Sequence, residues 1–311
     1  MKAVQYRSFG GPEVLEITDV PDPKKFHDLV LVRIEAAGLN PADLGFQSGL
    51  ADALVDSHFP VTPGWDLAGV VEWSGATTTG FVPGDEVIGF VRNKAQHYGT
   101  YAEKITAEPR QLLRKPANLT WAQAAGLPVA GLTAYQAIVQ ALKVTAGDVV
   151  LVHGAAGGVG HLAVQIAVAR GAQVIGTGSE ASQTFIESLG ATAVRYGAEL
   201  TEQVRELAPD GVDAVLDAAG RGSLATTREV ARADARVATL TGAVADHPGT
   251  IDVGMNPERG GFAELVELVE QGAVTVHVDH VFPLDEAAHA QQLLAGGHAR
   301  GKIVLQIREE V

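Results

Sequence analysis

Residues 149–160 combine residue types that could bind a phosphate group. An apolar run at 149–152 enters a turn rich in glycine, and apolar residues at helical spacing follow the turn. In a strand–turn–helix unit, Gly157 lets the backbone approach a pyrophosphate, Gly158 keeps the turn tight and Gly160 lets helix and strand pack closely. The helix N-terminus adds free N–H groups and a positive dipole end. The pattern predicts a dinucleotide-binding turn, and an ordinary strand-to-helix turn is the alternative.

The composition excludes several classes of protein. With 311 residues, of which 46% are hydrophobic and 19% charged, the chain can form two domains with sizeable cores. The net charge of −14 argues against partners such as nucleic acid or an anionic membrane surface. The absence of cysteine excludes disulfides, thiolate zinc sites and a cysteine nucleophile. No stretch approaches the ~18–20 apolar residues of a membrane span, and the first residues lack an apolar signal core, so we expect a cytoplasmic protein.

Short strands separated by turns fill the first part of the chain. Pairs such as Pro63-Gly64 and Pro83-Gly84 interrupt the strand patterns. The candidate strands are residues 2–6, 14–19, 29–37, 68–73 and 86–90. This spacing over residues 1–118 predicts a β-barrel-like domain.

From about residue 120 the pattern alternates between helix and strand. Helical stretches are 121–126, 131–142, 158–170, 181–189, 200–207 and 223–232, and strands are 148–153, 173–177, 192–196, 212–217 and 235–240. This alternation predicts an α/β fold with a parallel, doubly wound sheet. Two further helices, at 261–271 and 286–295, and a strand at 303–307 complete the pattern.

Seven ordered motifs together match one known family. They are Gly38-Leu39-Asn40-Pro41-Ala42-Asp43, Pro63-Gly64-Trp65-Asp66-Leu67-Ala68-Gly69, Pro83-Gly84-Asp85-Glu86-Val87, Gly99-Thr100-Tyr101-Ala102-Glu103, Ala130-Gly131-Leu132-Thr133-Ala134, the turn at 155–160 and Arg300-Gly301-Lys302-Ile303-Val304. Over nearly its whole length the chain resembles the medium-chain dehydrogenase/reductases, in particular their zinc-free quinone oxidoreductase (zeta-crystallin-like) branch. The resemblance implies a GroES-like β-barrel catalytic domain, residues 1–118 and 256–311, around a Rossmann NADP-binding domain at 119–255.

The positions that bind zinc in the alcohol dehydrogenases of this superfamily hold other residues here. The resemblance places Asn40 and Val129 where those enzymes have cysteines, and Trp65 where they have a histidine. None of these three side chains is a usual zinc ligand, and the histidines show no pair at i, i+4 spacing that would replace them. We therefore expect no metal site.

The resemblance also implies three catalytic candidates, Asn40, Asp43 and Thr133. In the quinone reductase branch the residues matching Asn40 and Asp43 lie in the cleft near the nicotinamide, and the Asn contacts bound cofactor or substrate. Thr133 matches a threonine beside the nicotinamide and the pyrophosphate. The alternatives are structural, since Asn-Pro favours a turn, and Asp43 or Thr133 could cap a helix. For Asp66 we expect a structural hydrogen bond to the backbone.

Cofactor contacts are expected from the glycine turn and from the ends of neighbouring strands. The candidates are Ala156, Gly157, Gly158, Val159, Gly160, Gly178, Ser179, Tyr196, Ala218, Leu240 and Thr241. Gly178 stands where an NAD enzyme carries an acidic residue, which favours NADPH, and the resemblance brings Tyr196 to the 2′-phosphate. Glu180 and the absence of a cation in the next positions argue the other way. The substitution Gly178→Asp should reverse the preference.

The resemblance and the motifs lead to one expected function and two alternatives. We expect NADPH-dependent reduction of a small-molecule quinone or α,β-unsaturated carbonyl by a zinc-independent homodimer. The tyrosines that quinone reductases often carry after the Asn-Pro segment are replaced by Gly45, Phe46, Leu50 and Ala51, so the substrate wall differs. The alternatives are an NADPH-binding protein without turnover, of a crystallin-like or regulatory kind, and an enoyl-thioester reductase. The second would need a basic entrance for the acyl carrier, which a charge of −14 does not suggest.

Overall fold

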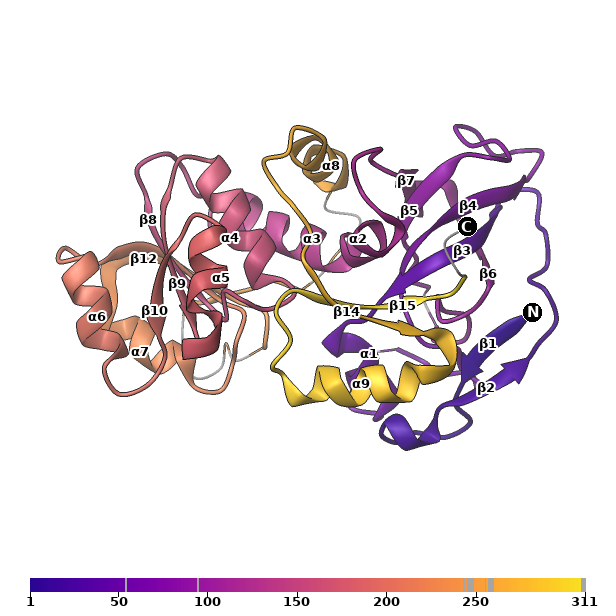
Figure 1. The fold of residues 1–311 in the computed structure, drawn as a ribbon, viewed down its shortest axis with the longest axis horizontal. Helices are drawn as coiled ribbons and strands as arrows, with labels where there is room; N and C mark the ends of the chain where they lie inside the picture. The colour runs from indigo at the N-terminus through magenta and orange to yellow at the C-terminus, as the bar shows by residue number, and fades with distance from the viewer. Residues whose placement is uncertain are drawn as a thin grey trace. The chain divides into compact units, whose positions relative to one another are not determined.

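The chain folds as two units, and one of them is made from two separated segments (Figure 1). This split unit contains Met1–Val129 and Val276–Val311, and the central unit contains Ala130–Thr275. The structure, a computed structural model, describes residues 1–53, 55–93, 95–242, 244, 249–254, 256 and 260–308.

The split unit is built around a mainly antiparallel sheet, in which only β14 and β15 pair in parallel among the described strands. Its strands are β1 (Lys2–Gln5), β2 (Glu16–Asp19), β3 (Val30–Gly38), β4 (Asp66–Ser74), β5 (Glu86–Phe90), β6 (Lys104–Ala107), β7 (Leu112–Arg114), β14 (Val278–Pro283) and β15 (Lys302–Gln306). Its helices are α1 (Pro41–Gln47), α2 (Trp121–Gly126) and α9 (Ala287–Gly296), with short 3-10 turns at Pro12–Val14, Pro109–Gln111 and Leu284–Glu286. The seven-stranded sheet has the order β14-β15-β3-β4-β5-β7, with β6 also paired to β3, while β1 and β2 pair separately.

The two segments of the split unit share one core. Strand β15, from the second segment, pairs antiparallel with β3, from the first, so that Val304 faces Gly38. Leu39 and Val4 pack in the same buried cluster as Ile303 and Leu305. Burial of these apolar side chains from both segments stabilises the unit only when both are present.

The central unit is a parallel sheet with helices between its strands. The strands are β8 (Val149–His153), β9 (Gln173–Gly178), β10 (Thr192–Arg195), β11 (Val212–Asp217), β12 (Ala231–Thr239) and β13 (Ile251–Asp252). The helices are α3 (Pro128–Tyr135), which begins in the last residues of the split unit, a π-helix (Gln136–Ala141), α4 (Gly160–Ala169), a 3-10 turn (Glu180–Ser182), α5 (Gln183–Ser188), α6 (Leu200–Leu207), α7 (Ser223–Val230) and α8 (Phe262–Glu270). The parallel order β10-β9-β8-β11-β12-β13 confirms the predicted doubly wound α/β sheet.

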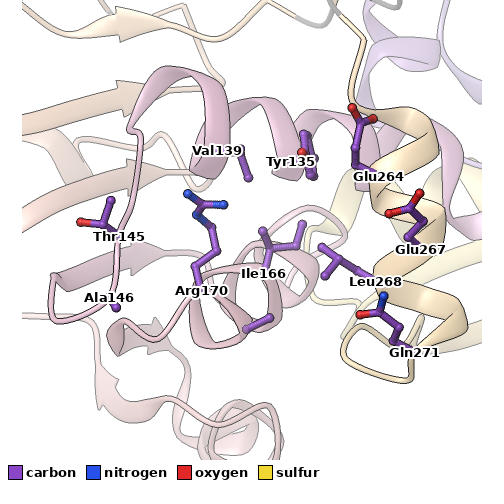
Figure 2. Close-up of a pocket in the computed structure, with 11 residues that line it drawn as sticks. Tyr135, Val139, Thr145, Ala146, Ile166, Arg170, Glu264, Glu267, Leu268 and Gln271 are labelled. Atoms are coloured by element: carbon purple, nitrogen blue, oxygen red, sulfur yellow. The ribbon is translucent and has the colours of Figure 1, made fainter.

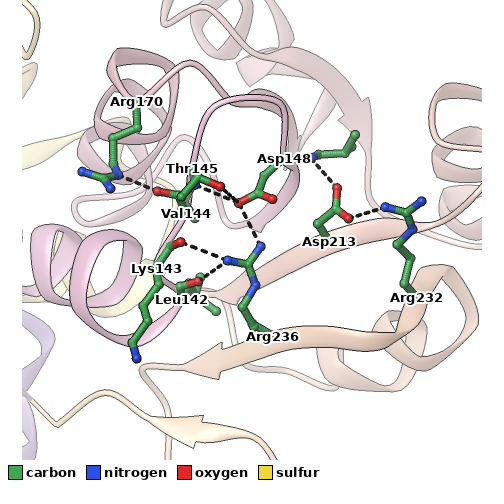
Figure 3. A network of polar contacts seen from close by, with 10 residues as sticks. Leu142, Lys143, Val144, Thr145, Asp148, Arg170, Asp213, Arg232 and Arg236 are labelled. Atoms are coloured by element: carbon green, nitrogen blue, oxygen red, sulfur yellow. Dashed lines mark hydrogen bonds and ion pairs between the residues drawn. The ribbon is translucent and has the colours of Figure 1, made fainter.

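Ion pairs and hydrogen bonds hold the amino end of this parallel sheet (Figure 3). Arg236 pairs with Asp148 (2.8 Å), just before β8, and also donates to the carbonyl oxygen of Leu142 (2.7 Å). Asp213 accepts from the backbone N–H of Val149 (2.8 Å) and pairs with an arginine of β12. These groups satisfy one another's hydrogen-bonding capacity, and the bonds hold the first residues of the neighbouring strands in place.

The division between the units falls later in the chain than the borders at 118/119 and 255/256 expected from the sequence. Helix α2 packs on β3, β4 and β15, and a Cβ on its Gly126 would lie 3.1 Å from Val276 Cγ1, so this helix is part of the split unit. At the second border, the Gln165 side chain donates to the carbonyl oxygen of Thr275 (2.9 Å) and accepts from its N–H (2.9 Å). That pair of bonds keeps residues up to Thr275 in the central unit.

Several element boundaries also differ from the expected ranges. Strand β2 begins at Glu16, since the residues before it form a 3-10 turn that starts at Pro12. Helix α4 begins at Gly160, because residues before it form the glycine turn, and α7 ends at Val230. Among the described residues, no helix is long and apolar enough to cross a membrane.

Candidate functional site

The turn between β8 and α4 is shaped by its glycines. Gly154 has a φ of +71°, which side chains rarely adopt, and a Cβ on Gly160 would lie 2.0 Å from the Gly154 carbonyl oxygen. A Cβ on Gly157 would lie 3.3 Å from the same oxygen, a much milder contact. Gly160 is buried, whereas the four residues before it are only half-buried. Backbone next to the N-terminus of α4 is therefore accessible to an anion, as a pyrophosphate site requires.

The sequence candidates for cofactor binding gather at the carboxyl edge of the parallel sheet. The carboxyl edge is defined here as the turn Ala156, Gly157, Gly158, Val159, Gly160 with the strand-end residues Gly178, Ser179, Tyr196, Ala218, Leu240 and Thr241. Because the strands are parallel, their carboxyl ends meet at one edge. The chain proceeds from β8 toward β10 on one side and from β11 toward β13 on the other. Sheets of this kind bind ligands at such a reversal point.

Asp217, which the sequence analysis did not single out, organises two loops of this edge. Its Oδ1 accepts from the N–H groups of Ala219 (3.0 Å) and Gly220 (2.8 Å) and from Ser223 Oγ (2.7 Å). Its Oδ2 accepts from Thr239 Oγ1 (2.9 Å) and Thr241 Oγ1 (3.3 Å). Burial raises the pKa of Asp217, but these hydrogen bonds outweigh it and hold the pKa below its usual range. The charged carboxylate thus fixes the loops that carry Ala218 and Thr241.

Gly178 is a packing position as well as a strand end. A Cβ there would lie 2.4 Å from Ser182 Oγ and 2.5 Å from Ile186 Cδ1, and both neighbours are buried. The substitution Gly178→Asp would therefore force the Ser182 and Ile186 side chains to shift. The reversal of cofactor preference expected for this substitution stays a prediction, and it is not a simple exchange of charge, since two buried side chains would also have to move.

A cationic side chain, that of Arg195, lies next to Gly178 on the neighbouring strand β10. Arg195 ends β10, its Cα is the register partner of Gly178, and its Nη1 lies 3.3 Å from Glu180 Oε2. Tyr196 follows it and is 58% exposed. Arg195 was not among the residues predicted from the sequence, because a cation was expected only in the positions directly after Gly178. The signal that could have found it is the position directly before Tyr196, because parallel strands place their ends side by side.

Thr133 lies in the interior of α3 and not at its start. The helix begins at Pro128, five positions earlier, and Thr133 is buried in the central unit. The alternative that its hydroxyl caps the helix is therefore wrong. Contact with a cofactor stays a prediction for this residue.

The two catalytic candidates of the split unit lie in a buried polar network. The Asn40 network is defined as Asn40, Asp43, Asp66, Tyr101 and Lys302, all buried. Asn40 Nδ2 donates to Asp66 Oδ2 (2.9 Å), and Lys302 Nζ donates to Asn40 Oδ1 (2.6 Å). Both ends of the Asn40 amide are therefore oriented, by a carboxylate on one side and an ammonium on the other. Lys302 Nζ also lies 3.7 Å from Asp66 Oδ2.

Asp43 joins this network from the first turn of α1. Its Oδ2 accepts from the Asn40 N–H (2.8 Å) and from the Tyr101 hydroxyl (2.9 Å). The first of these bonds caps the N-terminus of α1, which confirms the capping role considered for Asp43. Burial raises the pKa of Asp43 to about 7, against the lowering effect of both hydrogen bonds.

Asp66 and Lys302 form a buried ion pair within the network. Burial raises the pKa of Asp66 to about 6, while Lys302, Asn40 and the Val129 N–H (2.8 Å from Oδ1) stabilise its charged form. Burial lowers the pKa of Lys302, and the two carboxylates oppose this. The hydrogen bond that Asp66 accepts from the Val129 N–H confirms the expected bond between Asp66 and the backbone.

Asn40, Trp65 and Val129 occupy the positions that hold zinc ligands in the alcohol dehydrogenases of the superfamily, and their surroundings do not suit a zinc ion. The Asn40 side chain is held by Lys302 and Asp66, and Val129 offers only its backbone. The Trp65 ring packs edge-on against Phe46, with ring centroids 4.9 Å apart. An ammonium beside Asn40 would repel a cation. In the part of the chain that the structure describes, no three His, Cys, Asp or Glu residues form a group that could hold a metal.

A surface groove of the central unit lies elsewhere and contains none of the candidates (Figure 2). It measures about 430 Å³ and is lined by Tyr135, Arg170, Glu264 and Glu267, among others. Ala146, also in its wall, precedes β8, so the groove is at the amino end of the sheet. Nucleotides bind at the opposite edge in such folds.

Comparison with known proteins identifies the family. Residues 27–117 match the alcohol dehydrogenase GroES-like domain, and residues 189–305 match a family described as zinc-binding dehydrogenase. A 2-methylene-furan-3-one reductase of Solanum lycopersicum is 37% identical over 98% of this chain and 79% of its own length. An NADPH-dependent alkenal/one oxidoreductase of Arabidopsis thaliana, named as chloroplastic, is 36% identical with the same coverage. The chain belongs to the medium-chain dehydrogenase/reductase superfamily, in its quinone oxidoreductase branch.

Solved structures agree with this assignment. One described as an NAD-dependent alcohol dehydrogenase has a TM-score of 0.89 at 32% identity and covers 99% of this chain and 100% of its own. A mycobacterial protein in complex with NADPH has a TM-score of 0.87 at 28% identity, with the same coverage. The protein is therefore an oxidoreductase whose fold is that of nicotinamide-dependent enzymes. Its GroES-like domain confirms the expectation from the resemblance.

Proposed function

We propose that the protein reduces a quinone or an α,β-unsaturated carbonyl with NADPH and without zinc. The observation that carries the proposal is the carboxyl edge, where the glycine turn and the loops ordered by Asp217 flank the reversal point between β8 and β11. Arg195 lies at the same edge, at the end of the outermost strand β10. The names of the relatives, an alkenal/one oxidoreductase among them, support the substrate class. The residues at the zinc positions support a metal-free reaction.

The residues of the chain have separate parts in this proposal. When bound, NADPH supplies the hydride. Backbone N–H groups of the turn from Ala156 to Gly160 hold the pyrophosphate, except that of Gly157, which donates to the Gly154 carbonyl oxygen (3.0 Å). Thr133 contacts the cofactor. The small residues of the loops ordered by Asp217 leave room for the nicotinamide ring.

Asn40 is the proposed catalytic donor. One of its Nδ2 hydrogens goes to Asp66, and the second is assigned to the oxygen on which negative charge develops during reduction. Lys302 and Asp66 act as positioning residues, because they fix which end of the amide faces each way. Asp43 is reassigned in this proposal from a catalytic to a positioning residue, since its carboxylate holds the Asn40 backbone.

A homodimer in the cytoplasm completes the proposal. Sedimentation at micromolar concentration measures the oligomeric state, and a monomer would contradict it. Fractionation of the source cells tests the location, which matters because one relative is named as chloroplastic.

Steady-state NADPH consumption with a panel of quinones, enones and enals tests the activity. The proposed function predicts saturable turnover that survives a chelator, in protein without stoichiometric zinc. Saturable NADPH binding without turnover on any acceptor would favour the non-enzymatic alternative. Turnover only with enoyl thioesters would favour the acyl reductase, and one zinc per chain lost together with activity would overturn the metal-free mechanism.

A further inference from the structure

We infer that Arg195 is the residue that selects the 2′-phosphate of NADPH, and that Glu180 holds this guanidinium when no phosphate is bound. The inference rests on the proposed function, since it deepens the account of the same nucleotide site. It concerns a pair that spans β10 and the turn after β9, at 3.3 Å.

The position of the pair fits the adenosine ribose. In doubly wound folds the residue about 20 positions after the glycine turn contacts the ribose 2′-OH, or an arginine nearby takes a 2′-phosphate. Counting from the turn leads to Gly178 and the residues just after it. Arg195 is the register partner of Gly178 on the adjacent strand, and Glu180 is two residues beyond Gly178. Both charges therefore lie where the two cofactors differ.

The exposure of the pair lets it exchange partners. The side chains of Arg195 and Glu180 are 65% and 82% exposed. Ion pairs this exposed contribute little net free energy, so the guanidinium loses little on leaving Glu180. A 2′-phosphate and a carboxylate can each accept two parallel N–H bonds from an arginine, but the phosphate carries more charge. Arg195 should thus prefer a 2′-phosphate to Glu180 when one is present.

Glu180 limits the preference that Arg195 creates. Its carboxylate competes for the guanidinium and repels a phosphate, and it can accept a hydrogen bond from the 2′-hydroxyl of NADH. The pair therefore predicts a protein that binds both cofactors, with a moderate preference for NADPH. Such a dual preference would explain why Glu180 and Arg195 both lie at the expected ribose position.

The adenosine halves of the two cofactors, 2′,5′-ADP and 5′-AMP, test the contacts of Arg195 and Glu180 separately from the rest of the nucleotide site. The experiment measures the affinity of the whole protein for 2′,5′-ADP and for 5′-AMP by calorimetry, in the parent, R195Q, R195K and E180Q. R195Q should weaken 2′,5′-ADP by about 10-fold, as expected for loss of one charged hydrogen-bonding partner, and leave 5′-AMP within about 2-fold. R195K should retain part of the affinity. E180Q should strengthen 2′,5′-ADP by several-fold, because a competitor for Arg195 is removed.

A matched control comes from the split unit, where Arg110 and Glu108 form another exposed pair (2.6 Å). R110Q changes the net charge as R195Q does and should leave both affinities unchanged. Equal losses in R110Q and R195Q would mean a general charge effect and would overturn the inference. Unchanged 2′,5′-ADP affinity in R195Q would overturn it as well while leaving the proposed function standing. If the parent binds neither half-cofactor nor NADPH, the proposed function itself fails.

Discussion

Two ion pairs, one in each unit, differ in their exposure to water. Lys302 and Asp66, in the split unit, are 3% and 0% exposed, whereas Arg195 and Glu180, in the central unit, are 65% and 82% exposed. The buried pair has fixed neighbours, because Asn40 bonds to both of its members. The exposed pair can change partners at small cost. A buried pair thus suits the orientation of a donor, and an exposed pair suits the recognition of a ligand.

Removal of the buried cation should have the largest effect on stability. K302M leaves Asp66 buried without its ammonium, so the free energy of unfolding should fall by about 3–5 kcal/mol. Urea unfolding of the parent and the variant measures this loss. K104M is the control, since Lys104 pairs with Asp22 (2.9 Å) at a partly exposed site and should cost about 1 kcal/mol or less. Equal losses in the two variants would remove the distinction between buried and exposed pairs.

The glycine turn offers a second comparison, between two glycines three positions apart. G160A places a methyl group 2.0 Å from a carbonyl oxygen, so the turn must deform, and NADPH affinity should fall by at least about 10-fold. The free energy of unfolding should also fall by about 1–3 kcal/mol. G157A, with its contact at 3.3 Å, should lose less on both measures. Fluorescence titration measures the NADPH affinity and a melting curve measures the stability of each variant. The same affinity in both variants would contradict the role of Gly160 in shaping the turn.

Protonation of Asp43 should make stability depend on pH. Its pKa is about 7 in the folded protein and about 3.9 when unfolded, so between these values the folded state keeps a proton that the unfolded state has released. The free energy of unfolding attributable to Asp43 should therefore fall as pH rises from about 4 to 7, by at most ~1.4 kcal/mol per pH unit. D43N has no titratable carboxyl at this position, so the slope due to Asp43 should appear in the difference between parent and D43N. Asp66, with a pKa raised to about 6, titrates in both proteins.

The difference between the two proteins is needed because His153 acts in the opposite direction. Burial lowers the pKa of His153 to about 4, so its contribution to stability is lost as pH falls from about 6.5 toward 4. That contribution is common to parent and D43N and cancels between them. A difference that stays constant from pH 4 to 7 would show that Asp43 ionises normally in the folded protein.

The smallest expected effect is a gain, in the helix that carries Asp43. Gly45 lies inside α1, and a Cβ there would meet no atom within 4 Å. G45A should raise the free energy of unfolding by about 0.5–1 kcal/mol, because alanine loses less backbone entropy in a helix. Affinity for NADPH should not change. A loss of stability in G45A would mean that the helix needs glycine for a backbone reason.

Local patterns were enough to predict most of the fold. Helical and strand periodicities found the alternating elements of the central unit, since each pattern depends on residues close in sequence. The π-helix at Gln136–Ala141 was missed, because its apolar residues read like those of an ordinary helix. The borders of the units were missed because they depend on contacts such as Gln165 with Thr275, 110 residues apart.

The candidate site divides in the same way. The glycine turn and the strand ends could be located from the sequence, because parallel strands bring their ends together without knowledge of side chains. The partnership of Asn40 with Lys302 joins residues 262 positions apart, and no pattern in one sequence indicates it. Arg195 differs from Lys302, because its position directly before Tyr196 could have indicated it, although its pairing with Gly178 depends on strand register.

A ribosome makes the closing strands of the split unit last. Strands β14 and β15 are synthesised only after the whole central unit, which is one continuous segment and can fold before them. At ~5–20 residues per second, the first segment therefore waits roughly 10 s or more for its partner strand and for Lys302. During that interval the β3 edge that β15 will cover is open, and Asp66 has no ammonium beside it. In this period the nascent chain exposes an unpaired strand edge, which can pair with other chains.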